Sequence, residues 1–166
     1  MTVLLRTMQA DDLAAVYQIQ TQAYVADMVE VPALLAARLA SAPECAWVAV
    51  QDNQILAYLA AYPSIRGKIS ALGQDFQIAR PANALYLHDM AVATEHKGKG
   101  LARAILEFAL AHARQQGWQH ACLVSVQSTR SYWQSLGFIE QTDLDTEQKT
   151  TLATYTGTAH YMLMDL

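Results

Sequence analysis

The 166-residue chain is 53% hydrophobic and has a formal net charge of −4 when its histidines are neutral. Its length suits a full apolar core, so we expect residues 1–166 to form a single domain. The acidic balance argues against nucleic acid as the main partner, because phosphate backbones need a dense basic surface. No apolar run reaches the roughly 18 residues of a membrane span, so we predict a cytoplasmic protein with no membrane partner.

The cysteines and histidines predict neither a disulfide framework nor a metal site. Cys45 and Cys122 are far apart, and each lies within an apolar stretch. We therefore expect both thiols to be buried and reduced in the core. The five histidines form no close cluster with cysteine, so no structural zinc site is predicted.

The first part of the chain predicts a strand followed by two helices. Residues 2–6 can form the strand, and an aspartate at position 11 or 12 can cap the first helix. Pro32 suits the first turn of the second helix, and Pro43 ends it. Apolar residues recur at helical spacing in both segments, so each helix is expected to pack one face against a core.

The middle of the chain predicts a hairpin, a long connection and a central strand. Residues 45–50 and 54–62 are apolar stretches that flank a short polar turn, as in a β-hairpin. Residues 63–83 contain two prolines and two glycines, which predicts a long connection. Long connections within compact domains are often functional or mobile. Residues 84–92 form a continuous apolar run, which indicates a buried central strand.

The last part of the chain predicts a long helix, a strand, a short helix and a late hairpin. Residues 100–116 are the clearest helix, and 120–126 the next buried strand. Residues 128–136 suit a short helix, and 138–141 and 159–166 suit the hairpin. The long helix is expected to present one face with Leu101, Ile105, Phe108 and His112. The predicted fold is a mixed α/β (α+β) sheet with helices on both faces.

A glycine-rich turn joins the central strand to the long helix in the stretch LHDMAVATEHKGKGLARAIL, residues 87–106. The first backbone N–H groups of a helix lack intrahelical partners and lie at its positive end. Cations there are unfavourable by about 0.3–1 kcal/mol each, yet Lys97, Lys99 and Arg103 gather at this point. A bound polyanion would offset that cost, and glycines would let it approach the backbone.

The glycine turn also has alternative interpretations. A solvated lysine-glycine turn accounts equally well for the glycines alone. The stretch lacks the four-residue gap and the Lys-Ser/Thr ending of a P-loop. It also lacks the third glycine and the later acidic residue of a dinucleotide-binding fingerprint.

The same stretch resembles the central motif of the GNAT superfamily of acyl-CoA-dependent N-acyltransferases, (Gln/Arg)-x-x-Gly-x-(Gly/Ala). Two registers fit, Glu95-x-x-Gly98-x-Gly100 and Lys97-x-x-Gly100-x-Ala102, and both depart from the family at the first residue. Further stretches resemble other family segments in the expected order. These stretches are LRTMQADDLAAVYQIQ (5–20), ILAYLAAYP (55–63), SYWQSLGF (131–138) and TYTGTAHYMLMDL (154–166).

This resemblance implies the GNAT fold: a central, mostly antiparallel sheet of about seven strands, with strands 4 and 5 parallel and splayed. It also implies acetyl-CoA as co-substrate and no metal. The coenzyme's pantetheine arm would lie beside the fourth strand, and its pyrophosphate would rest on the amides of the glycine turn. The implied coenzyme-binding residues are Met90, Ala91, Val92, Lys97, Gly98, Lys99, Gly100, Leu101, Ala102, Arg103, Ser128 and Trp133.

His88 and Asp89 precede the coenzyme-binding stretch, where some family members carry a Glu-Asp pair whose glutamate has been assigned as the base. His88 takes the place of that glutamate, and an imidazole with a reference pKa of about 6.5 can accept a proton near neutral pH. Neighbouring strand residues point to opposite faces, so both can face one pocket only if a bulge intervenes. A packed, hydrogen-bonded histidine is the equal alternative.

The sequence does not identify the general acid, because Trp133 stands where the family usually has a tyrosine. Tyr132 is the adjacent candidate, about 100° around a helix, and Tyr155 is a remote one. Water or the substrate ammonium could also supply the proton. Tyr24, Asp27 and Glu30 are candidates for the acceptor pocket, although a solvated helix face is the simpler reading for any one of them.

The sequence therefore predicts an N-acetyltransferase that moves an acetyl group from acetyl-CoA directly to a primary amine of a small molecule. Two alternative functions fit the same residues. The first is an acyl-CoA-binding sensor without catalysis, and the second is a protein N-terminal or lysine acetyltransferase. The sequence is compatible with a homodimer but does not require one.

Overall fold

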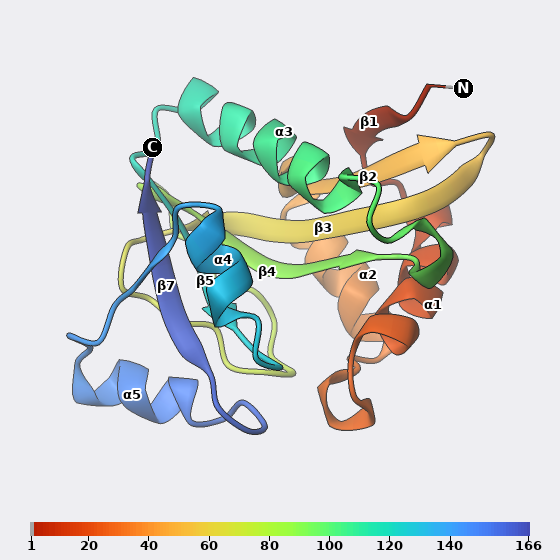
Figure 1. Cartoon of the computed structure of the whole chain (residues 1–166). Coiled ribbons are helices and arrows are strands. Elements are labelled where there is room, and N and C mark those ends of the chain that lie inside the picture. Colours follow the sequence, from red (N-terminus) through yellow and green to blue (C-terminus); the bar gives the residue numbers. More distant parts are fainter. Residues whose placement is uncertain (1) are drawn as a thin grey trace.

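A computed structural model describes residues 2–166 and shows a seven-stranded mixed sheet with helices on both faces (Figure 1). The strand order is β1-β2-β3-β4-β5-β7-β6. The strands are β1 (Leu4–Thr7), β2 (Ala46–Gln51), β3 (Gln54–Ser64), β4 (Ala84–Val92), β5 (His120–Ser125), β6 (Ile139–Glu140) and β7 (His160–Asp165). The α-helices are α1 (Leu13–Ala23), α2 (Pro32–Ser41), α3 (Leu101–Gln115), α4 (Arg130–Ser135) and α5 (Thr146–Leu152).

The predicted fold class is confirmed, and the local signals explain most boundaries. The β2–β3 hairpin turns through Asp52 and Asn53, which both have positive φ angles of 51° and 62°. Two consecutive left-handed residues match the twist of the flanking strands. Pro32 stands at the first turn of α2, and Gly117, with φ of 75°, follows α3. Late in the chain, β7 lies between β5 and β6 in the sheet.

The parallel pair at the centre of the sheet separates along its length. β4 and β5 pair only from Ala84 with His120 to Leu87 with Leu123. Beyond that point β4 continues to Val92 next to β3, while β5 continues to Ser125 next to β7. The two strands therefore part at the end of β4 that leads to the glycine turn, as the predicted splay requires.

Two apolar layers cover the sheet. Helix α3 packs with the central strands on one face, and α1 and α2 pack on the other (Figure 1). The expectation for Phe108 was wrong, since its side chain is 42% exposed. The buried residues of α3 are Leu101, Ile105, Leu106, Ala109, Leu110 and Ala113. These residues form the buried side of the helix. Phe108 precedes the buried Ala109 and lies outside that side, so it points towards solvent.

The long connection between β3 and β4 is held in place by the C-terminal part of the chain. Ile69 N–H donates to Gln148 Oε1 of α5 at 2.7 Å, and Gly67 N–H donates to the Tyr161 hydroxyl at 2.9 Å. The Tyr155 hydroxyl donates to Ser70 O at 2.8 Å. Helix α5 was not predicted. Within residues 2–166, no helix has the length and apolarity needed to cross a bilayer.

Candidate active site

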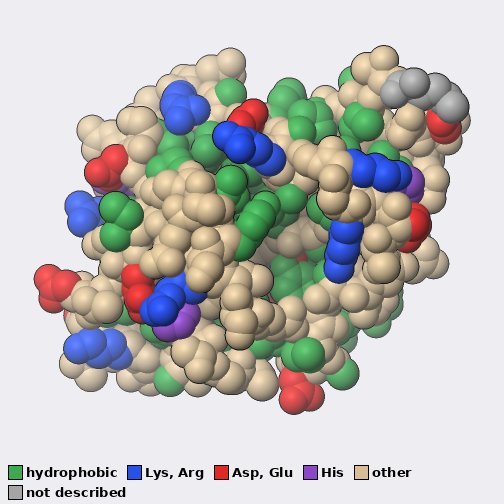
Figure 2. Space-filling view, in the orientation of Figure 1, with side chains coloured by type: hydrophobic (Ala, Val, Ile, Leu, Met, Phe, Trp, Pro, Cys, Tyr) green, Lys and Arg blue, Asp and Glu red, His purple; other side chains and the backbone are tan. Residues whose placement is uncertain are grey.

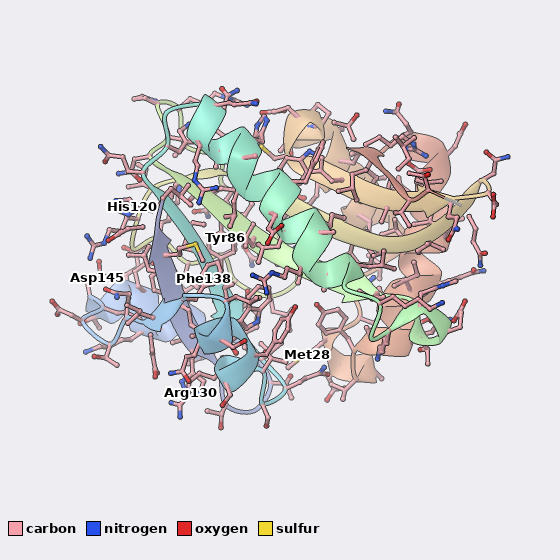
Figure 3. All side chains as sticks on the ribbon, turned by 45° about the horizontal axis from the view of Figure 1, so that its top comes forward. Met28, Tyr86, His120, Arg130, Phe138 and Asp145 are labelled. Carbon is pink, nitrogen blue, oxygen red and sulfur yellow. The ribbon has the colours of Figure 1, made fainter. Side chains whose placement is uncertain are left out.

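A cavity of about 670 Å³ opens where β4 and β5 part. Figure 2 shows the hollow near the middle of this face, with hydrophobic side chains on its walls and basic side chains near its upper rim. The lining comes from the end of α1 and the segment after it, from β4, the glycine turn, the end of β5, and α4. Figure 3 shows Met28 across the gap from α4. Of the residues predicted to bind the coenzyme or to act in catalysis, all line the cavity except Lys99 and Ser128.

The glycine turn forms an open cradle of backbone N–H groups at the start of α3. Gly98 and Gly100 have φ angles of 76° and 77°, which favour glycine, and no atom lies within 4 Å of a Cβ added at either one. Within the described part of the chain, the N–H groups of residues 98–102 donate to no loop carbonyl or side chain. The N–H of the preceding residue, Lys97, donates to Thr94 O at 3.4 Å. The turn can therefore accept an anion.

A β-bulge turns two neighbouring side chains of β4 to the same face. Leu87 pairs with Ala61 and Asp89 pairs with Ala60, which leaves His88 as the extra residue. The bulge reverses the usual alternation. His88 and Asp89 consequently both line the cavity and both lie on the side of α1 and α2.

Asp89 places one free carboxylate oxygen in this cavity. The residue is only 8% exposed, and its Oδ2 accepts a hydrogen bond from the Tyr58 hydroxyl at 2.6 Å. Its buried Oδ1 has no hydrogen-bond partner of good geometry among residues 2–166, although the Tyr24 hydroxyl lies close enough to Asp89 to affect its titration. Burial raises the pKa of Asp89 above its ordinary value, and the Tyr58 hydrogen bond, the neighbouring His88 and the Tyr24 hydroxyl offset part of that rise. A carboxylate in this state suits proton transfer or an ammonium partner.

The second buried charge cluster joins Glu30, Arg38 and His88. Arg38 Nη1 and Nη2 donate to the two Glu30 oxygens at 2.5 and 2.7 Å. His88 Nε2 lies 2.9 Å from both Glu30 Oε1 and Arg38 Nη1. Burial raises the pKa of Glu30, but the hydrogen bonds from His88 and Arg38 outweigh this and bring it down to about 2. Arg38 also lies 4.9 Å over the Phe76 ring.

Helix α4 supplies the aromatic wall of the cavity. Trp133 packs edge-on against Tyr132 at 5.3 Å and Phe138 at 5.5 Å between ring centroids. Tyr132 is 41% exposed, and partial burial raises its pKa, with Arg103 offsetting part of the shift. Tyr155 lines the cavity too, and burial raises its pKa to about 12. Both phenols therefore keep their protons at neutral pH.

Some residues around the site were missed by sequence reasoning. Tyr58 and Arg38 were not singled out, although an arginine inside the apolar helix sequence PALLAARLAS was an available signal. Glu30 and Tyr24 were named as candidates and line the cavity, whereas Asp27 does not. Cys45 and Cys122 are fully buried as expected, and burial raises the pKa of each thiol to about 12.

Together, the parted parallel strands and the open glycine turn define the class of CoA-dependent acyltransferases that the sequence resembles. The sequence profile of the acetyltransferase (GNAT) family matches residues 13–138. The chain therefore belongs to the GNAT acetyltransferase family.

Known proteins of this class show how far the similarity extends. Human N-acetyltransferase 8B is 31% identical over 103 residues, which cover 60% of this chain and 40% of that protein. The PaiA N-acetyltransferase of Thermoplasma acidophilum, solved with coenzyme A, has a TM-score of 0.72 at 13% identity over all of both chains. The ribosomal-protein-S18-alanine N-acetyltransferase of Escherichia coli has a TM-score of 0.68 at 19% identity, covering 99% of this chain and 94% of that one. At these identities the two solved structures share the fold.

Proposed function

We propose that residues 1–166 act as one N-acetyltransferase domain that transfers the acetyl group of acetyl-CoA directly to a primary amine of a small molecule. One observation carries the proposal. A cavity that begins at the unbonded amides of the glycine turn reaches a buried carboxylate oxygen with no partner, Asp89 Oδ1. An anion-binding end and a cation-binding end in one cavity suit a diphosphate co-substrate and an amine.

The coenzyme diphosphate would rest on the N–H groups of residues 98–102, with Lys97 and Arg103 beside it. The pantetheine arm would follow β4 through the gap that β5 leaves. Strand residues rise by about 3.3 Å each, so the distance along β4 from Val92 to Asp89 is about 10 Å. The thioester would then lie near Met90, within reach of the Asp89 carboxylate.

Transfer needs a neutral amine, a stabilised carbonyl oxygen and a proton for the leaving thiolate. The amine nitrogen forms a C–N bond with the thioester carbon, and the C–S bond breaks. Asp89 takes the proton that the amine loses, directly or through water. The geometry favours Asp89 over His88 for this step, because His88 Nε2 is already held between Glu30 and Arg38. Tyr132 is the proposed proton donor to the thiolate.

A panel of amines tests the proposal through release of the CoA thiol, with acetyl-CoA as the only donor. We expect turnover with at least one small primary amine and a strong loss of turnover in Asp89→Asn. Coenzyme binding without turnover on any amine or peptide would support a sensor instead. Acetylation of peptides alone would support the protein acetyltransferase.

A further inference from the structure

Glu30, Arg38 and His88 form one cluster of ion pairs at the acceptor end of the cavity, and the Asp89 carboxylate stands outside it. Glu30 and Arg38 are both buried and form a two-point ion pair, so together they carry no net charge. Asp89 has no cationic partner within 4 Å among the described residues. We infer that the acceptor is a primary monoamine carried on an apolar body, such as an alkyl- or arylalkylamine. This inference names the substrate class of the proposed function and rests on it.

The ion pair leaves at most one hydrogen-bonding position for a substrate, because His88 Nε2 either donates to Glu30 Oε1 or accepts from Arg38 Nη1. Besides Arg38, the Glu30 oxygens face His88 Nε2 at 2.9 Å and Gly73 N–H at 2.9 Å. Arg38 also donates to the carbonyl oxygen of Gln74, from Nε at 3.1 Å and from Nη2. A second ammonium therefore finds no free carboxylate here, and a substrate carboxylate finds no free guanidinium.

The neutral polar groups on this side of the cavity are also occupied. The Gln20 side chain forms two hydrogen bonds with the backbone of Glu30, at 2.8 and 3.2 Å. The Tyr24 hydroxyl donates to Met90 O at 3.1 Å, and the Tyr155 hydroxyl donates to Ser70 O. Peptide or amide groups of a substrate would lose their water here without gaining these partners, which is costly.

Two buried side-chain atoms of this part of the cavity have no hydrogen-bond partner among the described residues, Asp89 Oδ1 and His88 Nδ1. An amine N–H can donate to Asp89 Oδ1, and both residues line the cavity. The rest of this part of the wall is apolar, with Met28, Leu72 and Leu87 in the lining. One charged head group and a body without polar groups match that arrangement.

Matched substrate pairs test the inference on the wild-type chain with acetyl-CoA. Hexylamine and hexane-1,6-diamine differ by one amino group, and 2-phenylethylamine and phenylalanine differ by one carboxylate. We expect kcat/KM to be about 10- to 100-fold higher for hexylamine and for 2-phenylethylamine than for their partners, since the extra charge would be buried unpaired. Equal or better use of the diamine or the amino acid would overturn the inference while leaving the acetyltransferase intact. Turnover on no amine would instead remove the proposed function, and the inference with it.

Arg38→Gln tests the charge balance itself. Removing the guanidinium leaves Glu30 uncompensated, so the preference for hexylamine over the diamine should shrink or invert. Arg80→Gln is the matched control, because Arg80 forms an exposed pair with Glu44 at 2.8 Å and does not line the cavity. An unchanged preference in a folded Arg38→Gln protein would contradict the inference. If that variant does not fold, the wild-type substrate pairs still decide the question.

Discussion

The side-chain amide of Gln127 links the backbone at Val25 to the far side of the cavity. Gln127 Oε1 accepts a hydrogen bond from Val25 N–H at 2.9 Å, and its Nε2 donates to Ala23 O at 3.2 Å. Gln127 follows β5, so this contact joins the end of α1 to the strand that parts from β4. Gln127 also has a φ of 52°, a conformation that costs a non-glycine residue free energy.

We predict that this contact positions the acceptor side of the cavity. Gln127→Ala and Gln127→Gly both remove the amide, so both should raise KM for the amine several-fold. Only glycine relieves the positive φ, which makes Gln127→Gly the more stable of the two by about 1 kcal/mol. Steady-state kinetics and thermal unfolding of the pair separate the two effects. A wild-type KM in both variants would remove the positioning role.

Asp89→Asn should lower kcat by about 100-fold or more, because the amide cannot accept the amine's proton. The pKa of Asp89 is raised by burial, so wild-type kcat/KM should fall as the pH drops through that raised value. The variant should lose this acidic limb of the pH–rate profile. Tyr58→Phe is the control that leaves the carboxylate in place, and an acidic limb that survives in Asp89→Asn would exclude Asp89 as the base.

The Asp89 carboxylate should lower the free energy of unfolding at neutral pH. An acid whose folded pKa lies above its unfolded value stabilises the fold only while it is protonated. Its contribution is complete below the unfolded pKa and is lost as the pH rises through the folded one. Asp89→Asn should therefore be at least as stable as the wild type at pH 7 in urea unfolding. A clear loss of stability would show that the charge is better compensated than its unpartnered Oδ1 indicates.

Glu30 should have the opposite effect on stability. Its pKa is lowered to about 2 in the folded chain, from an ordinary value of 4.5. Its contribution is therefore present above pH 4.5 and is lost as the pH falls towards 2, on the order of 3 kcal/mol in all. Glu30→Gln should weaken that acid dependence of the free energy of unfolding. Glu44→Gln, at an exposed ion pair, should leave it nearly unchanged.

Tyr132 should act on turnover, whereas Trp133 should act on coenzyme binding. Tyr132→Phe should lower kcat, because it removes the proposed proton donor, and should leave coenzyme affinity near the wild-type value. Trp133→Phe should act mainly on coenzyme affinity, since the indole packs in the wall of the cavity. Turnover and coenzyme titration of both variants check this. Full turnover in Tyr132→Phe would leave water or the ammonium as the proton source.

Sequence patterns predicted the parts of the fold that depend on local signals. Strand β4 spans the predicted residues 84–92, and the glycine turn lies where the lysine-glycine motif indicated. Helix α5 was not predicted because it is short and polar and therefore has no apolar periodicity. The signal that was present is its cap, since Asp145 Oδ1 accepts a hydrogen bond from Gln148 N–H at 2.8 Å.

Long-range features could not be predicted from local patterns. The bulge at His88 depends on how β4 pairs with β3, and only that register brings His88 and Asp89 to one face. The buried cluster joins residues 30, 38 and 88 from three separate elements. Periodicity alone gives no information on such pairings.

The central claim is that the open amides of the glycine turn bind the diphosphate of the coenzyme. Gly100→Glu and Gly117→Glu each place a glutamate at a left-handed glycine with open space around it, at opposite ends of α3. Their backbone strain is therefore matched, and only Gly100 lines the cavity. Calorimetric titration with acetyl-CoA should show binding abolished in Gly100→Glu and retained in Gly117→Glu. Wild-type affinity in a folded Gly100→Glu protein would contradict the account.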